Sequence, residues 1–337
     1  MKKVLIIYTG GTIGMKQEHG SRTLIPVDFK SITEQIPELK SLKCKIDYYA
    51  FDNPIDSSNV QPETWGDLAK VIEKKYDNYD GFVILHGTDT MAFTASALSF
   101  MITNLSKPIV FTGSQLPLGV IRTDAKRNLI TTIEIVSAKK VVPEVCIYFN
   151  SKLFRGNRAE KFSSSKFDAF HSLNYPVLAE AGVNIVYNEK AILNIPKGKF
   201  SVAYGFDTNV ALIKLFPGIQ PELITTIAGK KGLRAIVLET FGSGNAPTNK
   251  NFVSSISDAI KNNQLVINVS QCSGGSVDQG RYETSEQLKK IGVISGGDIT
   301  TEAALTKLMF LLEKNYPITK IAKIMEQDFK GELSEYK

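Results

Sequence analysis

Cysteine is scarce in this sequence. Among 337 residues there are three cysteines, Cys44, Cys146 and Cys272, and no CxxC pair. An odd number of unpaired cysteines is typical of a reducing compartment and argues against a zinc cluster held by thiolates. We therefore expect a cytoplasmic protein whose cysteines are small buried hydrophobic side chains.

Histidine is equally scarce. His19, His86 and His171 lie far apart in the sequence, and none belongs to an HExxH-like pair. This spacing disfavours a histidine-rich metal site. We expect no metal and no cofactor, and any catalysis must largely work without imidazole.

Long apolar runs and long basic runs are also missing. Val4–Ile7, after two lysines, is too short for a signal-peptide core and is predicted to be a buried strand. No stretch approaches the ~20 apolar residues that a bilayer-spanning helix needs. The net charge of +6 comes from 40 basic and 34 acidic residues without a long Lys/Arg block, which favours a solvated surface over a nucleic-acid footprint. We expect neither a membrane nor a nucleic acid as a partner.

The length and the hydrophobic pattern predict two α/β units. A chain of 337 residues exceeds the usual size of one domain, and its 43% hydrophobic composition is that of an ordinary globular protein. Between Asn188 and Asn209 the pattern gives way to Lys, Gly, Pro and short polar residues, which indicates a linker. We predict an N-terminal domain over residues 1–187, a linker over 188–209 and a smaller C-terminal α/β domain over 210–337.

Clusters of β-branched and other apolar residues predict the buried strands. In the N-terminal domain they alternate with segments that suit helices, which predicts a mostly parallel sheet with helices on both faces. Asp89–Leu105 is predicted to be one such helix, with Thr88 and Asp89 as cap residues. In the C-terminal domain we predict helices near Asn251–Lys261 and Thr301–Glu313. The predicted strands are Val4–Tyr8, Phe82–Leu85, Ile109–Phe111, Val145–Tyr148, Val210–Leu215, Ala235–Leu238 and Leu265–Val269.

Three motifs follow three of these strands directly. They are Tyr8–Met15 (YTGGTIGM), His86–Met91 (HGTDTM) and Thr112–Gln115 (TGSQ). Each has an ordinary structural interpretation, since glycines serve tight turns and Thr and Asp serve helix N-caps. Ligands of open α/β sheets bind at the carboxyl ends of strands, however, so we expect these hydroxyl-bearing loops to converge on one crevice. A threonine there needs a base to act as a nucleophile, and with histidine scarce that base must be Lys or Tyr.

The first two motifs, extended to Phe82–Met101, and the later Phe241–Pro247 (FGSGNAP) resemble the bacterial type I, cytosolic asparaginases over nearly the whole chain. The resemblance implies hydrolysis of L-asparagine to L-aspartate and ammonia, without a cofactor, through a threonine nucleophile and a β-aspartyl ester. It also implies a two-domain α/β fold and a homotetramer, a dimer of close dimers, with active sites at a subunit interface.

The site residues that the resemblance implies follow by position. Thr12 matches the nucleophile, and Thr88, Asp89 and Lys161 match a second triad that moves a proton and later activates water. For Lys161 the residue pattern alone favours a solvated surface lysine. Backbone N–H groups of the glycine-rich and HGTDT loops are natural oxyanion donors. The substrate-binding positions that the resemblance implies are Asp56, Ser57, Ser58, Thr88, Asp89 and Ser114.

The loop after Thr12 departs from the family pattern. Much of the family carries a tyrosine about a dozen residues after the first threonine, and the matching residue here is Leu24, which cannot relay a proton. An alignment shifted by one residue would offer only Thr23. Tyr282 lies in the segment that reaches this site from a neighbouring subunit in related enzymes, so it is predicted to be a catalytic replacement. Its alternative interpretation is a half-buried interface tyrosine.

Two rival functions remain at this point. An archaeal-type amidotransferase subunit that supplies ammonia for tRNA-bound glutamate shares these motifs but carries an extra N-terminal domain, whereas the first strand is expected here from Lys3. An asparagine-binding regulatory protein that has lost catalysis would account for Leu24. The intact Thr12, Thr88 and Lys161 argue against that second rival.

Overall fold

A computed structural model describes residues 1–17, 24–26, 34–280 and 283–334. Two compact units are present: Met1–Ser172 with Pro176–Tyr204, and Leu173–Tyr175 with Gly205–Lys337. None of the helices in the described part of the chain combines the length and the apolar character that a bilayer span requires.

The first unit is built on an eight-stranded sheet in the order β13-β12-β9-β8-β7-β5-β1-β4. The five strands from β8 to β4 pair in parallel, and the three on the other side pair antiparallel. The strand bounds are β1 Lys2–Tyr8, β4 Cys44–Ala50, β5 Gly81–Leu85, β7 Ile109–Thr112, β8 Val145–Phe149, β9 Lys152–Arg155, β12 Ala179–Ala181 and β13 Ile185–Tyr187.

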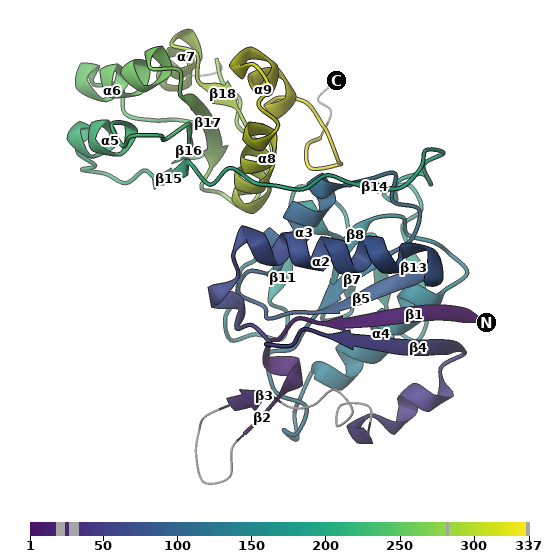
Figure 1. The fold of residues 1–337 in the computed structure, drawn as a ribbon. Helices are drawn as coiled ribbons and strands as arrows, with labels where there is room; N and C mark the ends of the chain where they lie inside the picture. Colours follow the sequence, from purple (N-terminus) through teal and green to yellow (C-terminus); the bar gives the residue numbers. More distant parts are fainter. Residues whose placement is uncertain (18–23, 27–33, 281–282, 335–337) are drawn as a thin grey trace. The chain divides into compact units, whose positions relative to one another are not determined.

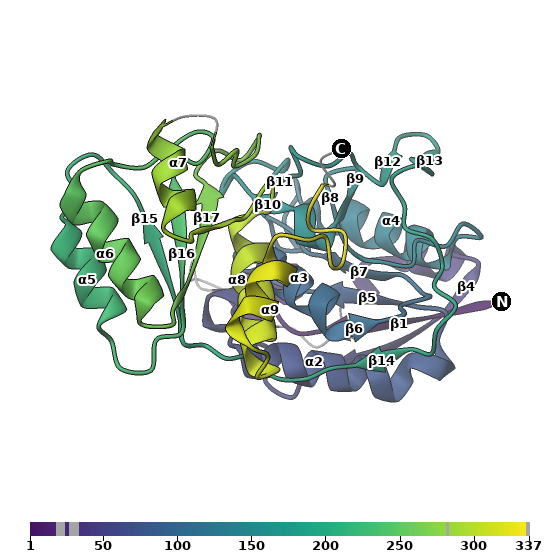
Figure 2. The same cartoon turned by 90° about the horizontal axis from the view of Figure 1, so that it is seen from above.

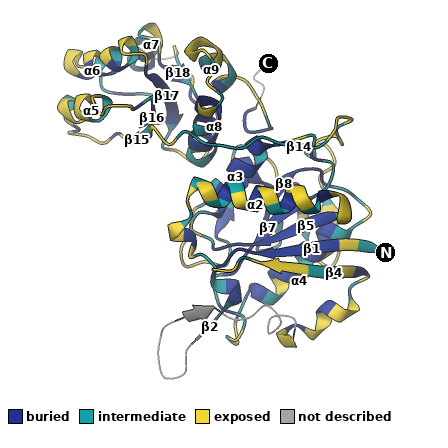
Figure 3. Ribbon diagram, viewed as in Figure 1, coloured by how far each residue is buried: buried dark blue, intermediate teal, exposed yellow. Residues whose placement is uncertain are grey.

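Helices cover both faces of this sheet, as predicted. α2 (Pro62–Lys75) and α3 (Met91–Met101) lie on one face and α4 (Ala125–Ser137) on the other (Figures 1 and 2). The central strands β5, β7 and β8 are buried along their whole length, because side chains on both faces meet helices (Figure 3). The amphipathic helices α2 and α4 expose their polar sides.

The helix predicted over Asp89–Leu105 is shorter than expected at both ends. α3 begins at Met91, and its N-cap position is Thr90 rather than Thr88 or Asp89. It ends at Met101, where β6 (Ile102–Thr103) pairs antiparallel with β14 (Ser201–Val202). Two β-branched residues favour the extended conformation, and Asn104, with φ of 56°, then turns the chain.

The second unit is a four-stranded parallel sheet in the order β15-β16-β17-β18. α5 and α6 lie on one face, and α8 and α9 on the other (Figure 2). β15 is an edge strand with Leu212 exposed, so the prediction of a buried strand there was wrong for much of its length. The bounds are β15 Val210–Lys214, β16 Ala235–Thr240, β17 Leu265–Ser270, β18 Ile294–Ser295, α5 Pro221–Ala228, α6 Lys250–Lys261, α7 Glu283–Lys290, α8 Thr301–Glu313 and α9 Ile318–Met325.

A fully buried ion pair fixes the chain after α9 in this unit. Lys307 on α8 lies 2.6 Å from the carboxylate of Glu332, and neither side chain is exposed. Lys307 also donates to the carbonyl of Gln327, and Glu332 accepts from the backbone N–H groups of Phe329 and Lys330. The charges are therefore compensated by short hydrogen bonds, which a buried pair needs to be tolerated.

Glu332→Gln should be strongly destabilising, because it leaves the Lys307 ammonium buried without its counter-charge. Removing one partner of such a pair typically costs about 3–5 kcal/mol. Calorimetric unfolding would measure the loss, with Lys261→Met as the control, since its exposed pair with Asp258 should be worth about 0–1 kcal/mol. Equal unfolding temperatures for the two variants would contradict the prediction.

The cysteine prediction holds for two of the three residues. Cys44 and Cys146 are buried, but Cys272 is exposed in the loop after β17. Burial raises the pKa of the Cys146 thiol well above its usual value.

Candidate active site

The three motif loops leave adjacent strands of the first sheet. β1, β5 and β7 are parallel neighbours, and Tyr8, Leu85 and Thr112 stand in register at their carboxyl ends. The chain therefore leaves the sheet at the same level three times. The three loops therefore start side by side at one edge of one sheet, as expected, and their convergence on one crevice stays a prediction.

The glycine-rich loop makes close backbone contacts that a plain turn does not need. Gly10 and Gly11 have φ of 134° and 91°, a region that L side chains rarely adopt. A Cβ on Gly11 would lie 2.4 Å from the nitrogen of Gly87, and one on Gly10 would lie 2.1 Å from the carbonyl oxygen of Ile55. The absence of a side chain at Gly11 therefore lets the loop that carries Thr12 pack against the HGTDT loop, and the absence of one at Gly10 lets it pack against the backbone of Ile55.

Thr12 is the first residue of a short 3₁₀ helix, Thr12–Gly14, and is partly exposed. The C-terminal end of this helix is held by Tyr8, whose buried hydroxyl donates to the carbonyl of Gly14 at 3.1 Å. Burial raises the pKa of Tyr8 to about 12, so the hydroxyl remains a donor at neutral pH. The nucleophile candidate thus lies on a segment fixed at both ends.

Lys161 bridges the two side chains that the family resemblance assigns to it. Its Nζ donates to Thr88 Oγ1 at 2.8 Å and to Asp89 Oδ1 at 2.6 Å. The Lys161 side chain is 16% exposed and that of Asp89 is 61% exposed. Lys161 lies on β10 (Glu160–Lys161), which pairs with β11 (Phe170–His171). A solvated surface lysine would not make this pair of contacts, so the geometry favours the triad interpretation.

The segment with Asp56, Ser57 and Ser58 lies against the same loop. Ser57 is buried, its carbonyl accepts from Thr90 Oγ1 at 2.7 Å, and its hydroxyl would be 2.4 Å from a Cβ on Gly87. Asp56 caps the short helix Ser57–Asn59 by accepting from the N–H and hydroxyl of Ser58, each at 2.9 Å. The structure therefore brings this segment beside Thr88, and the substrate-binding roles stay a prediction.

The third motif contributes more than Ser114, which is buried and has no hydrogen-bond partner among the described residues. Gln115, which the site prediction omitted, accepts from Thr88 Oγ1 at 3.5 Å and donates to the carbonyl of Lys166 at 2.9 Å. It links the triad threonine to the loop after Lys161. The motif TGSQ contained this signal, because an amide beside a hydroxyl pair can both donate and accept.

Asp124 holds this third loop in place and was also missed. Its buried carboxylate accepts from the backbone N–H groups of Gln115 and Leu116, at 3.1 Å, and from Asn128 Nδ2. Asn128 in turn donates to the carbonyl of Gly113 at 3.0 Å. An acidic residue just before an amphipathic helix could have indicated such a loop clamp.

The sequence matches two models of known protein families. Residues 3–193 match the family described as "Asparaginase, N-terminal", and residues 209–325 match "Glutaminase/Asparaginase C-terminal domain". This chain belongs to the asparaginase family.

Relatives of the asparaginase family match over almost the full length. The chain is 39% identical to L-asparaginase 1 of Escherichia coli K12, with 99% of this chain and 98% of the relative covered. The crystal structure of L-asparaginase I from Vibrio cholerae has a TM-score of 0.90 at 38% identity, with 99% of each chain covered. The thermostable L-asparaginase from Thermococcus kodakarensis has a TM-score of 0.92 at 35% identity, covering 99% of this chain and all of that one.

The structure does not test the departure from the family pattern at Leu24 or its predicted replacement by Tyr282. Tyr282 lies outside the described residues. For Leu24 the backbone belongs to β3 (Leu24–Pro26), which pairs with β2 (Met15–Gln17) so that Leu24 stands opposite Gln17. β3 thus pairs with the strand that follows the Thr12–Gly14 helix in the chain, and the replacement of the family tyrosine stays a prediction.

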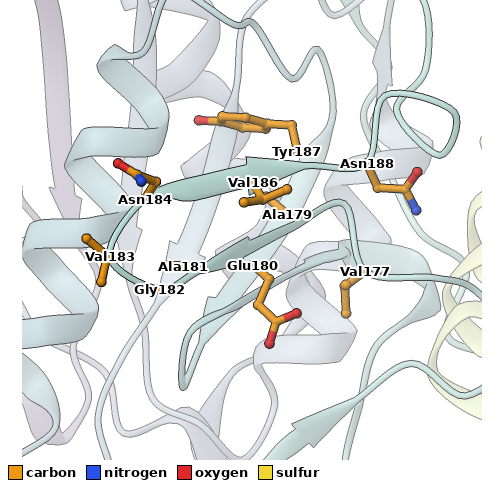
Figure 4. Close-up of a pocket in the computed structure, with 10 residues that line it drawn as sticks. All are labelled: Val177, Ala179, Glu180, Ala181, Gly182, Val183, Asn184, Val186, Tyr187 and Asn188. Carbon is orange, nitrogen blue, oxygen red and sulfur yellow. The ribbon is translucent and has the colours of Figure 1, made fainter.

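A hollow of about 620 Å³ on the β12–β13 hairpin holds none of the predicted site residues. It is lined mainly by small and apolar side chains such as Val177, Ala179 and Val186 (Figure 4). A hydrolytic site needs a nucleophile and convergent polar groups, which the three motif loops offer and this hollow does not.

Proposed function

We propose that this chain is an L-asparagine amidohydrolase that uses Thr12 as its nucleophile. The observation that carries the proposal is the position of Lys161, which contacts both Thr88 and Asp89 beside the loop of Thr12. The asparaginase family membership supports the same reaction.

The proposed reaction has two steps. Thr12 Oγ1 bonds to the side-chain amide carbon of asparagine, the C–N bond breaks, and the Thr12 proton leaves with ammonia. Water then attacks the resulting β-aspartyl ester, which releases L-aspartate and returns the proton to Thr12. Lys161 shares its protons with Thr88 and Asp89, so this network can pass a proton to the leaving amine and take one from the water.

The neighbouring loops supply the other groups that the reaction needs. Fixed backbone N–H groups of the glycine-rich and HGTDT loops would stabilise the oxyanion. Asp89, near the start of α3, and the segment Asp56–Ser58 would hold the α-amino and α-carboxylate groups of the substrate. Ser114 would provide a further contact.

We further propose a cytoplasmic homotetramer, a dimer of dimers. The support is the resemblance to the type I, cytosolic asparaginases, and the predicted contribution of Tyr282 from a neighbouring subunit would make activity depend on assembly. Sedimentation analysis across a dilution series, with activity measured on the same samples, would test this. A fully active monomer would refute it.

Asparagine should be strongly preferred over glutamine. In a pocket that fits the shorter side chain, one extra methylene displaces the amide carbon, and about 1 Å of misplacement can cost about 10² in rate. Ammonia release would be measured for both amides with the purified protein. Equal kcat/KM values would contradict the specificity, and saturable asparagine binding without steady ammonia release would favour the regulatory alternative.

A further inference from the structure

His86 is the first residue of the HGTDT motif and has no role in the reaction proposed above. The residue is 2% exposed, and both ring nitrogens have partners. Nδ1 lies 2.7 Å from the carbonyl oxygen of Gly87, and Nε2 lies 3.0 Å from Thr94 Oγ1 on α3. The indole N–H of Trp65 on α2 donates to the same Thr94 hydroxyl at 3.2 Å. A short series of hydrogen bonds therefore links Trp65 on α2, Thr94 on α3 and His86 in the HGTDT loop.

Only one arrangement of protons on the neutral His86 ring satisfies every hydrogen bond in this series. A carbonyl oxygen can only accept, so Nδ1 must carry the proton. Nε2 of the neutral ring then accepts from the Thr94 hydroxyl, while the Thr94 oxygen accepts from Trp65, which can only donate. Burial lowers the pKa of His86 to about 4, so the neutral ring is the form present at neutral pH.

The carbonyl that His86 holds shares a peptide unit with the N–H of Thr88. Every described peptide bond is trans, so this N–H points away from the carbonyl and hence away from the buried imidazole. Among the described residues, no acceptor for the Thr88 N–H is present. The same Gly87 backbone is the surface against which Gly11, one residue before Thr12, is packed.

We propose that His86 is a positioning residue that presents the Thr88 N–H as an oxyanion donor. Its Nδ1–H fixes the orientation of the Gly87–Thr88 peptide beside the Thr12 loop, and hydrogen bonding at the carbonyl polarises the amide and strengthens its N–H as a donor. Thr94 and Trp65 fix the tautomer that makes this possible. The inference rests on the proposed amide hydrolysis and adds the residue that orients its oxyanion donor.

The test compares His86→Leu with His86→Asn. Leucine cannot donate to Gly87, whereas the asparagine amide nitrogen can occupy roughly the place of Nδ1. Loss of an oxyanion donor typically costs about 10²–10³ in rate. We expect kcat of His86→Leu to fall by about that factor, with KM nearly unchanged. We expect kcat of His86→Asn to be at least about tenfold higher than that of His86→Leu. Leucine and asparagine variants with equal kcat values, or a loss confined to KM, would overturn the proposal.

A second pair of variants separates positioning from stability. Thr94→Val removes the hydroxyl that fixes the His86 tautomer, and Thr306→Val removes a fully buried hydroxyl that bonds only within α8. Both should lower the unfolding temperature to a similar extent, but only Thr94→Val should lower kcat. A parallel loss of kcat in both variants would mean that His86 acts only on stability.

The tautomer itself is a readout that does not depend on activity. Nitrogen NMR of histidine-labelled protein should show His86 neutral with the proton on Nδ1 at pH 7. The other tautomer, or a charged ring, would overturn the positioning role even if the enzyme is active. If wild type releases no ammonia from asparagine while His86 shows the expected tautomer, the proposed function fails and the hydrogen-bond chain still stands.

Discussion

Thr12→Ala is expected to abolish asparagine hydrolysis while leaving the fold intact. In the proposed reaction the Thr12 hydroxyl oxygen forms the covalent bond to the substrate, and the other residues of the short helix Thr12–Gly14 carry no hydroxyl. A hydrolase that loses a nucleophile acting as part of a unit loses on the order of 10⁶ in kcat. Ammonia release under single-turnover and steady-state conditions would measure the loss.

The matched variant for this experiment is Thr12→Ser, which keeps the hydroxyl and removes only a methyl group. It should retain measurable turnover and should accumulate the ester intermediate with asparagine. Thermal unfolding of both variants should match wild type, because Thr12 is partly exposed. Near-normal turnover by a correctly folded Thr12→Ala protein would remove Thr12 from the mechanism.

The second large effect is expected at the Thr88–Lys161 contact. Thr88→Val removes the hydroxyl at constant size, and Lys161→Met removes the ammonium at nearly constant length. Each should lower kcat by about 10²–10⁴, the usual value of a positioned proton-transfer group. Because the two side chains act through one 2.8 Å hydrogen bond, the double variant should lose little more than the worse single variant.

Lys152→Met provides the control for the loss of a lysine. Lys152 forms a long, partly exposed pair with Asp168 at 3.8 Å and has no hydrogen bond or ion pair with a predicted site residue in the described part of the chain, so activity should be close to wild type. Steady-state kinetics would be measured for wild type, the two single variants and the double variant, which form a double-mutant cycle, and for Lys152→Met as the control. Losses that multiply in the double variant would show that Thr88 and Lys161 work independently, and the triad would then be the wrong description.

Much of the fold follows from local pattern. The central strands β1, β5, β7 and β8 were predictable because both of their faces are buried, which produces continuous apolar runs. The strands β9, β12 and β13 are only three or four residues long, and the pairing of β9 with β12 joins segments distant in sequence. No local period marks strands this short, so the antiparallel side of the sheet was missed.

The candidate site also has a part that the sequence predicted and a part that it did not. The three motif loops could be placed together from sequence, because parallel strands end at one edge of the sheet. Asp124 and Gln115 hold the loops through backbone groups of other segments, and the sequence signals at these two positions do not identify those partners. The helix start was misplaced because Thr88, Asp89 and Thr90 are all common cap residues, and only the contact with Lys161 shows that the first two serve another purpose.

The distribution of the cysteines gives this chain a built-in labelling site. Cys44 and Cys146 belong to the first unit and are buried, and burial raises the pKa of both thiols. Cys272 belongs to the second unit and is exposed, so a maleimide dye should find one accessible thiol on the folded chain. A fluorophore or spin label can therefore be attached to the second unit of the wild-type sequence without any cysteine replacement.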